Sequence, residues 1–321
     1  MSSALVGIGP TPVEVPPVVQ ALAAHLWSGT TVVPVWRNEY GGITVRLEDR
    51  RAQTAAVGDG AHGTGRQELI RRSRRGSRRR LARLNSPGHK NARRRARGAY
   101  LKWVPRHAPC PDPLAEADRL AWADPHVPVP RVLDVGRDAR GSWLLTAPVE
   151  AEGAIATSAI EPQWRALAER SAVALGAGLR RFHDALPTET CPFVRTAELR
   201  VADLTTAPTA PLTAAERATI STLGSPPAVD RLVVCHGDAT VPNTLLDQAG
   251  RFAAHVDVGD LGVADRWSDL AVTTRSVTRR YGPGLEPLVL AAYGVAPDDE
   301  RTTYYRALWD AEEAVRTRRA S

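Results

Sequence analysis

The 321-residue sequence contains only two lysines and three cysteines, and no hydrophobic run approaches the length of a membrane span. Its N-terminus also lacks the basic start and apolar core of a signal peptide, which predicts a cytoplasmic protein without a membrane anchor. Cys110, Cys191 and Cys235 are odd in number and lack the close spacing of metal ligands. Their arrangement excludes a disulfide framework and favours reduced, mostly buried thiols.

Positive charge is concentrated in one segment of the chain. Residues 66–97 carry 13 arginines and Lys90 against one acid, Glu68, a local balance of +13. Subtracting this from the net +7 of the chain leaves −6 on the other residues, so the rest of the protein is mildly acidic. Residues 50–98 are rich in Gly, Ser and Arg with little apolar periodicity, which predicts a solvated insertion without a packed core. Two alternatives stay open for this insertion: binding to RNA or another polyanion, and a misreading of an Arg-rich coding sequence.

The length of the chain, with 43% hydrophobic and 24% charged residues, is typical of a soluble globular protein with two lobes. The first half predicts strands, with one helix between the third and fourth and a short helical run at the start. The strands are expected at Thr31–Trp36, Ile43–Leu47, Ala99–Val104, Arg131–Val135 and Ser142–Val149, and the helices at Val18–Trp27 and Asp112–Ala123. The second half predicts mainly helices, at Glu161–Pro187, Trp267–Tyr281, Leu285–Tyr293 and Asp298–Arg316.

The most informative stretch of the sequence runs from His236 through Asp238 to Asn243. An apolar strand, Leu232–Cys235, leads into this loop, and a second apolar strand presents Asp257 fourteen residues after Asn243. Phosphoryl transfer needs one carboxylate at the acceptor hydroxyl, and an amide and a second carboxylate that hold magnesium on the nucleotide phosphates. The spacing matches the catalytic loop of kinases, with Asp-Val-Gly in place of their Asp-Phe-Gly.

A second set of residues in the first half fits the same chemistry. Lys102 lies inside an apolar strand, where it would pair with nucleotide phosphates, and Glu116 on the following helix would hold it. A hinge near residues 147–153 would offer the backbone groups of Ala147 and Val149 to adenine. The glycine-containing turn at residues 38–42 is where a kinase covers the phosphates, although Gly-Gly is usually only a turn.

Four other polar residues near these motifs are interpreted as structural. His236 is expected to pack and hydrogen-bond beneath the loop rather than act as a base, and His183 to be a core histidine. Asp269 would accept backbone N–H groups from the catalytic loop, and Asp247 would stabilise a turn.

The motifs resemble those of the aminoglycoside O-phosphotransferases. The resemblance is strongest over residues 233–243 and 255–271, and includes residues 101–103, 114–122 and 127–133. It implies an α+β fold of the bilobal protein-kinase type. A small five-stranded antiparallel N-lobe, residues 1–150, would bind the nucleotide, and a mainly helical C-lobe, residues 151–321, would carry the catalytic and aminoglycoside sites.

The resemblance also implies a role for each motif residue. Asp238 would be the catalytic aspartate, and Asn243 and Asp257 would bind Mg²⁺. Lys102 would bind the phosphates of ATP, with Glu116 as its partner. Carboxylates recognise the amines of such a drug through charge-assisted hydrogen bonds, and the residues expected to do so are Asp310, Glu312 and Glu313, with Arg275 as a polar anchor. We expect a monomer or weak dimer, and the acidic body argues against nucleic acid as a partner.

The position of the phosphorylated hydroxyl stays open. Cys-Pro-Phe at residues 191–193 resembles the 3″, streptomycin-directed enzymes, whereas Thr-Arg-Ser-Val at 274–277 and Arg-Arg-Tyr-Gly at 279–282 resemble the 3′ enzymes for kanamycin and neomycin. Asp260 departs from the family, because many members have a basic residue there. The alternative functions are a kinase of another small-molecule hydroxyl, such as homoserine or choline, and an RNA-binding protein that uses the Arg-rich segment.

Overall fold

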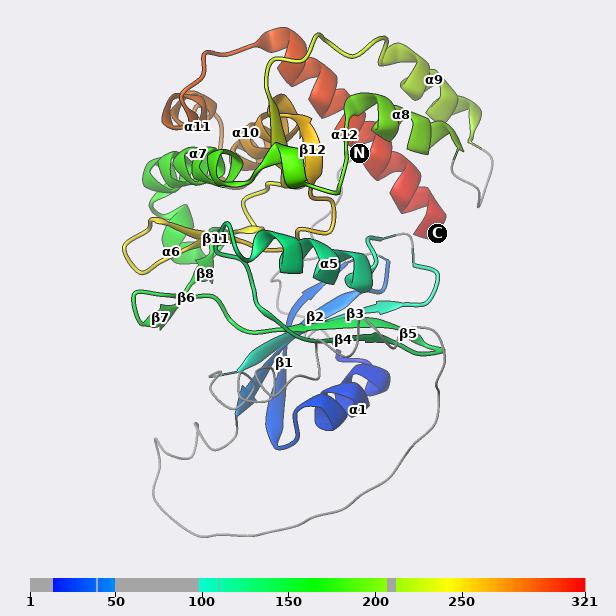
Figure 1. Cartoon of the computed structure of the whole chain (residues 1–321), viewed down its shortest axis with the longest axis vertical. Coiled ribbons are helices and arrows are strands. Elements are labelled where there is room, and N and C mark those ends of the chain that lie inside the picture. The colour runs from blue at the N-terminus through cyan, green and yellow to red at the C-terminus, as the bar shows by residue number, and fades with distance from the viewer. Residues whose placement is uncertain (1–13, 39, 50–97, 109, 207–211, 321) are drawn as a thin grey trace.

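The computed structural model describes residues 14–38, 40–49, 98–108, 110–206 and 212–320. Apart from Gly98, the predicted Arg-rich insertion lies outside these residues. The described chain forms two lobes, a sheet with two helices and a larger, mainly helical part (Figure 1).

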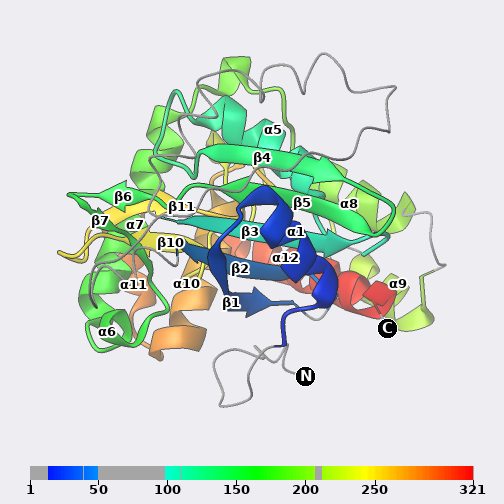
Figure 2. The same ribbon diagram turned by 90° about the horizontal axis from the view of Figure 1, so that it is seen from below.

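The small lobe is built on one antiparallel sheet with the strand order β1-β2-β3-β5-β4. Its elements are α1 (Pro17–Leu26), β1 (Thr30–Arg37), β2 (Ile43–Asp49), β3 (Ala99–Pro105), α5 (Pro113–Ala123), β4 (Val132–Arg137) and β5 (Gly141–Thr146). Figure 2 shows the five strands in this order, with α1 lying across the outer face of the sheet. The predicted five-stranded antiparallel lobe is therefore confirmed.

The alternation of β3 decides which way its lysine points. Leu101 and Trp103 pack in the apolar cluster that includes Val19 and Ala23 of α1. Because successive strand side chains point to opposite faces, Lys102 lies on the other face of the sheet, towards α5. The packing of the outer face thus positions the lysine at the boundary between the lobes.

Helix α5 begins with a strong start signal. The side chain of Asp112 accepts a hydrogen bond from the Leu114 N–H at 3.2 Å, and Pro113 occupies the first turn, where no N–H is needed. Leu120 packs in a cluster that contains Leu144 of the sheet and Phe182 of the large lobe, so α5 joins the two lobes. The same buried face carries Glu116, which is only 4% exposed.

The large lobe contains seven α-helices and several short strands within the described residues. The helices are α6 (Pro162–Arg165), α7 (Ala168–Ala185), α8 (Ala197–Thr206), α9 (Ala214–Thr222), α10 (Trp267–Tyr281), α11 (Glu286–Tyr293) and α12 (Asp299–Ala320), with a 3-10 turn at Thr188–Thr190. The strands are β6 (Glu150–Ala151), β7 (Ala154–Ile155), β8 (Thr157–Ser158), β9 (Leu232–Cys235), β10 (Thr244–Leu246), β11 (Phe252–His255) and β12 (Gly262–Asp265). No described helix has both the length and the apolar character needed to cross a bilayer.

The prediction of one continuous helix from Glu161 to Pro187 is wrong. The chain turns at Leu167, whose backbone leaves the helical region (φ −114°, ψ 41°), and this separates α6 from α7. Burial of the Trp164 side chain explains the break, since its ring packs into the lobe core and its carbonyl accepts a hydrogen bond from the Ser171 hydroxyl at 3.0 Å. Apolar periodicity alone does not report such a change of direction.

Candidate active site

The loop after β9 is held in place by one buried aspartate. Asp269, in the first turn of α10, accepts the backbone N–H of His236 at 2.6 Å and that of Gly237 at 2.9 Å. Its second neighbour is His183 of α7, whose Nε2 lies 3.0 Å from the carboxylate, and His183 Nδ1 lies 2.8 Å from the Tyr293 hydroxyl. The structural interpretation of Asp269 and His183 is confirmed.

His236 supports the loop from below. Its Nδ1 accepts a hydrogen bond from the Asp238 N–H at 3.1 Å, so the proton sits on Nε2, which donates to the carbonyl of Val256 at 2.9 Å. Burial lowers the pKa of His236, which keeps the ring neutral. Both nitrogens are thus occupied by backbone groups, and the expectation that His236 is structural is confirmed.

Asp238 combines a fixed orientation with an unpaired oxygen. Asn243 Nδ2 donates to Asp238 Oδ2 at 2.9 Å and to the Asp238 carbonyl at 3.0 Å. The other oxygen, Oδ1, is buried and has no hydrogen-bond partner within the described residues. Burial, and then the nearby carboxylate of Asp257, raise the pKa of Asp238 to about 7. A buried oxygen without a partner requires an explanation, and an acceptor hydroxyl at this point would supply one.

Lys102 connects the two lobes through two carboxylates. Its Nζ lies 2.7 Å from Glu116 Oε2 and also contacts Asp257 Oδ1. Burial alone would lower the pKa of Lys102, but Asp257 and Glu116 outweigh it and raise the pKa, so the ammonium stays charged. The structure therefore brings together the lysine, its glutamate partner and the second aspartate of the predicted set.

Asn243 and Asp257 present the oxygen donors that magnesium prefers. The Val256 N–H donates to the Asn243 carbonyl at 3.0 Å, which holds the two ends of the loop side by side. Because Asn243 uses its amide nitrogen on Asp238, its amide oxygen is not engaged in those bonds. Asp257 contacts Lys102 through Oδ1, which leaves its second oxygen for a metal, so the two residues fit a magnesium ion.

The predicted hinge follows β5 and leads into the short β6–β7 hairpin. The Ala147 N–H donates to the Arg131 carbonyl at 2.9 Å, and the Val149 carbonyl accepts from the Ala156 N–H at 2.9 Å. Neither bond uses the Ala147 carbonyl or the Val149 N–H, which are the groups that the adenine prediction requires.

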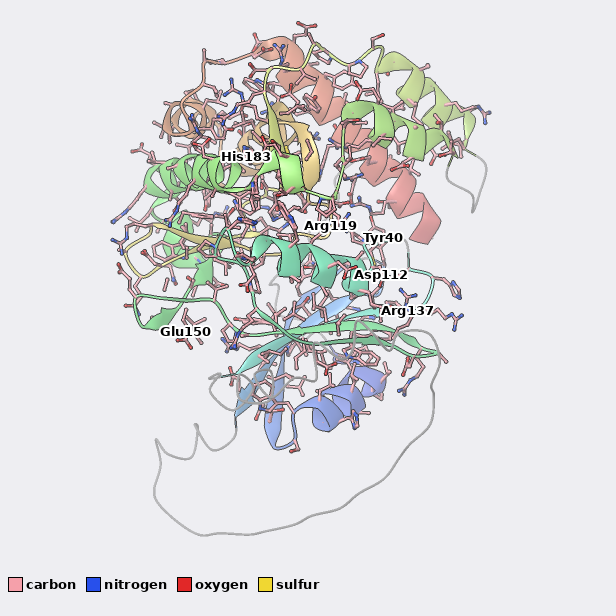
Figure 3. The ribbon with its side chains drawn as sticks, viewed as in Figure 1. Tyr40, Asp112, Arg119, Arg137, Glu150 and His183 are labelled. Carbon is pink, nitrogen blue, oxygen red and sulfur yellow. The ribbon has the colours of Figure 1, made fainter. Side chains whose placement is uncertain are left out.

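The β1–β2 turn extends from the sheet to the large lobe. Asn38 Oδ1 accepts the N–H of Tyr40 at 3.1 Å and that of Gly42 at 2.7 Å, which fixes the turn. The Tyr40 hydroxyl lies 3.3 Å from Glu313 Oε1 and 3.5 Å from Thr317 Oγ1, both on α12. Figure 3 shows Tyr40 at the boundary of the two lobes, beside the C-terminal part of α12.

The predicted drug-binding residues lie on α10 and α12, and the carboxylates are paired with arginines. Arg275 contacts Asp310 at 2.6 Å and lies over the Trp309 ring at 5.3 Å, while the Asp310 side chain is half exposed. Glu313 lies 3.5 Å from Arg316. Whether these residues contact a drug stays a prediction.

Two arginines that the sequence analysis did not single out hold Glu312. Arg200, which is 2% exposed, makes two bonds to the Glu312 carboxylate at 2.9 and 2.7 Å and a third to the Ser268 hydroxyl at 2.7 Å. Arg195 lies 3.4 Å from Glu312 and 3.1 Å from Asp260. The sequence does not identify these two arginines as partners of Glu312. The chain contains many arginines, and Glu312 is far from both in sequence.

Gly237 allows the catalytic loop to pass close to Asp260. Its φ is +88°, and a Cβ there would lie 2.4 Å from the Asp260 carbonyl oxygen. We expect Gly237→Ala to lower kcat by about 10²-fold, because a displacement of about 1 Å at the reacting groups has that effect. Gly284→Ala is the matched control, since its φ of +93° is similarly strained but nothing lies within 4 Å. Equal kinetic effects of the two variants, measured by steady-state turnover, would contradict the steric argument.

Comparison with known proteins places this geometry in a family. The sequence profile of the phosphotransferase enzyme family (APH) matches residues 65–306. An aminoglycoside 3′-phosphotransferase of Streptomyces fradiae is 34% identical over 216 residues, which cover 61% of this chain and 78% of the relative. A streptomycin 3″-kinase of Streptomyces griseus is 30% identical over 233 residues, 64% of this chain and 82% of the relative.

Solved structures share the fold over nearly the whole length. An aminoglycoside-3′-phosphotransferase of type VIII has a TM-score of 0.64 and 26% identity, and covers 91% of this chain and 97% of its own. The aminoglycoside phosphotransferase APH(3″)-Id of Streptomyces rimosus has a TM-score of 0.59 and 24% identity, covering 93% and 99%. The predicted bilobal kinase-like fold is confirmed, and the chain belongs to the phosphotransferase enzyme family.

Proposed function

We propose that this enzyme transfers a phosphoryl group from ATP to a hydroxyl of an aminoglycoside antibiotic and so confers resistance. The acceptor is the 3″-hydroxyl of streptomycin or the 3′-hydroxyl of the kanamycin and neomycin type. The observation that carries the proposal is the buried, unpaired Oδ1 of Asp238 beside the Lys102–Asp257 pair. Relatives named for both positions support the substrate class.

The residues of the small lobe bind and orient the nucleotide in this proposal. The Ala147 carbonyl and the Val149 N–H bind the edge of the adenine ring. The bonds described above use the Ala147 N–H and the Val149 carbonyl, and so leave these two groups available. Lys102 binds the phosphates, and Glu116 holds its ammonium at the boundary between the lobes. Asn243 and Asp257 would hold magnesium, which would supply positive charge to the phosphates.

Asp238 orients the acceptor hydroxyl and takes up its proton. The acceptor oxygen forms a bond to the γ-phosphorus, the bond from that phosphorus to the β–γ bridging oxygen breaks, and ADP leaves. A carboxylate with a pKa near 7 accepts a proton more readily at neutral pH than an exposed aspartate does. Because Asn243 holds Oδ2 by a hydrogen bond, the orientation of the Asp238 carboxylate is fixed and Oδ1 is the oxygen that accepts the proton.

The drug amines are proposed to meet the carboxylates of α12. Asp310 is half exposed and has one arginine partner in Arg275, whereas Glu312 is held on two sides by Arg200 and Arg195. Asp310 and Glu313 are therefore the carboxylates most open to a substrate amine, and Glu312 mainly fixes the helix. We place the reaction in the cytoplasm, where ATP is supplied.

A panel of acceptors tests the proposal. Purified protein with ATP and Mg²⁺ would be given streptomycin, kanamycin, neomycin, homoserine and choline, with ADP release as the measurement. We expect turnover with an aminoglycoside and none with the last two, and NMR of the product locates the phosphate. Turnover of only choline or homoserine would mean that the substrate is another small-molecule alcohol and not an aminoglycoside. Absence of turnover with all five would reject the proposal.

A further inference from the structure

An arginine of the last helix lies between two carboxylates. Arg316 of α12 is 4.0 Å from Asp260 Oδ2 and 3.5 Å from Glu313 Oε2. Asp260 follows directly after the Asp-Val-Gly segment, so the guanidinium reaches from the C-terminal helix to the catalytic loops. Figure 1 shows the end of α12 beside the boundary between the lobes.

Arg316 is held less tightly than Lys102 and Arg200. Lys102 lies 2.7 Å from Glu116, and Arg200 binds Glu312 through two bonds of 2.9 and 2.7 Å. Arg316 makes two longer ion pairs among the described residues, and 29% of its side chain is exposed. Short and bidentate charged contacts are the strong ones, so a competing charge displaces Arg316 more easily than Lys102 or Arg200.

The surroundings of Arg316 are those of the acceptor site. Asp260, which Arg316 contacts, lies three residues after Asp257, and its carbonyl oxygen lies against Gly237, the residue before Asp238. Two buried atoms of the same region, Asp238 Oδ1 and Arg195 Nε, have no hydrogen-bond partner among the described residues. A polar acceptor bound here would offer both atoms a hydrogen-bond partner.

We propose that Asp260 and Glu313 form a subsite for an ammonium or guanidinium group of the acceptor, and that Arg316 fills this subsite until the acceptor displaces it. The inference rests on the proposed function, because it requires a polycationic acceptor. The exchange replaces one cation by another, so neither carboxylate is left without a partner. Asp260 then acts in recognition of the acceptor.

Arg316 then competes with the cationic group of the acceptor for the subsite. When a binding-competent state is populated only part of the time, the apparent affinity falls by that fraction. A cation seated at Asp260 and Glu313 and a hydroxyl oriented by Asp238 would also fix two points of the acceptor. The distance between its amine and its hydroxyl then selects the position that is phosphorylated.

Steady-state kinetics of Arg316→Gln test the proposal. We expect the KM for the aminoglycoside to fall roughly three- to tenfold, the gain from removing the two partly buried ion pairs of Arg316 that compete. The kcat and the KM for ATP should stay within about twofold. Arg301→Gln is the matched control, because Arg301 lies in the first turn of the same helix and pairs with Asp298. It should change neither constant.

The double variant Glu313→Gln/Arg316→Gln separates competition from a general loosening of the helix. If the two residues share the subsite, the gain from Arg316→Gln disappears in the Glu313→Gln background. An unchanged or raised KM in Arg316→Gln would overturn the proposal. A fall of kcat by orders of magnitude would also overturn it, since Arg316 would then act on the phosphate. Failure of the wild type to phosphorylate any aminoglycoside would instead reject the proposed function.

Discussion

Asp238→Asn lowers kcat by about 10²–10⁴-fold, the usual contribution of a positioned acid–base group, and this is the largest kinetic effect that we expect. The amide has the size of the carboxylate, but it cannot accept the proton of the acceptor hydroxyl. The substitution also removes the negative charge of the carboxylate, which Asn243 orients through a hydrogen bond of 2.9 Å. ADP release with a saturating aminoglycoside is the measurement. The melting temperature should not fall, because the unpaired buried Oδ1 serves the reaction rather than stability.

Asp184→Asn serves as the control for this variant. Asp184 is another aspartate of the large lobe, but it is exposed and pairs with Arg180 and Arg231 away from the loop. It should retain wild-type kcat. Near-normal turnover of Asp238→Asn would remove Asp238 from the mechanism, and a large fall in both variants would point to a general structural effect.

The parts of the fold and site that are set by local pattern could be predicted from the sequence. Strand alternation places Lys102 on the inner face of β3, and the cap at Asp112 starts the helix that carries Glu116. Their meeting at 2.7 Å follows from two correctly predicted elements and the spacing between them. Asp269 was recognisable because it opens a helix that follows the catalytic strands.

The charge pairing between the C-terminal helix and the rest of the large lobe could not be predicted in the same way. The partners of Glu312 are Arg200 of α8 and Arg195 just before it, both more than a hundred positions earlier, and nothing in the sequence distinguishes them from the many other arginines. Arg316 was missed for a related reason, since it lies at the end of a helix and its contact with Asp260 depends on how that helix crosses the lobe. Tertiary packing decides these contacts, and no local periodicity reports it.

Asp269→Ala destabilises the protein by about 3–5 kcal/mol, the cost of removing one partner from a buried charged network. The carboxylate is fully buried, and its removal leaves the His236 and Gly237 N–H groups and the His183 ring without their acceptor. Because these N–H groups begin the catalytic loop, kcat should fall as well. Urea unfolding and steady-state turnover measure the two effects.

Asp247→Ala is the matched control for this second prediction. Asp247 is also buried and accepts two backbone N–H groups, those of Ala249 and Arg251, but it does so in the turn between β10 and β11. It should cost stability, by about 1–3 kcal/mol for the unsatisfied groups, and leave kcat unchanged. If Asp269→Ala affected stability alone, the loop would not depend on its hydrogen bonds for its active shape.

The pH dependence of stability distinguishes the charge of Asp269 from its shape. Burial opposes its ionisation, but the hydrogen bond and charge of His183, with the His236 N–H, outweigh burial and hold the pKa of Asp269 below its ordinary value. A depressed pKa stabilises the folded state fully above the unfolded pKa of about 3.9, and this contribution is lost as the pH falls through the folded value. The difference in unfolding free energy between wild type and Asp269→Asn should therefore be constant near neutral pH and shrink below about pH 4. A difference that stayed constant into acid would mean that the amide fails through its geometry, not through its missing charge.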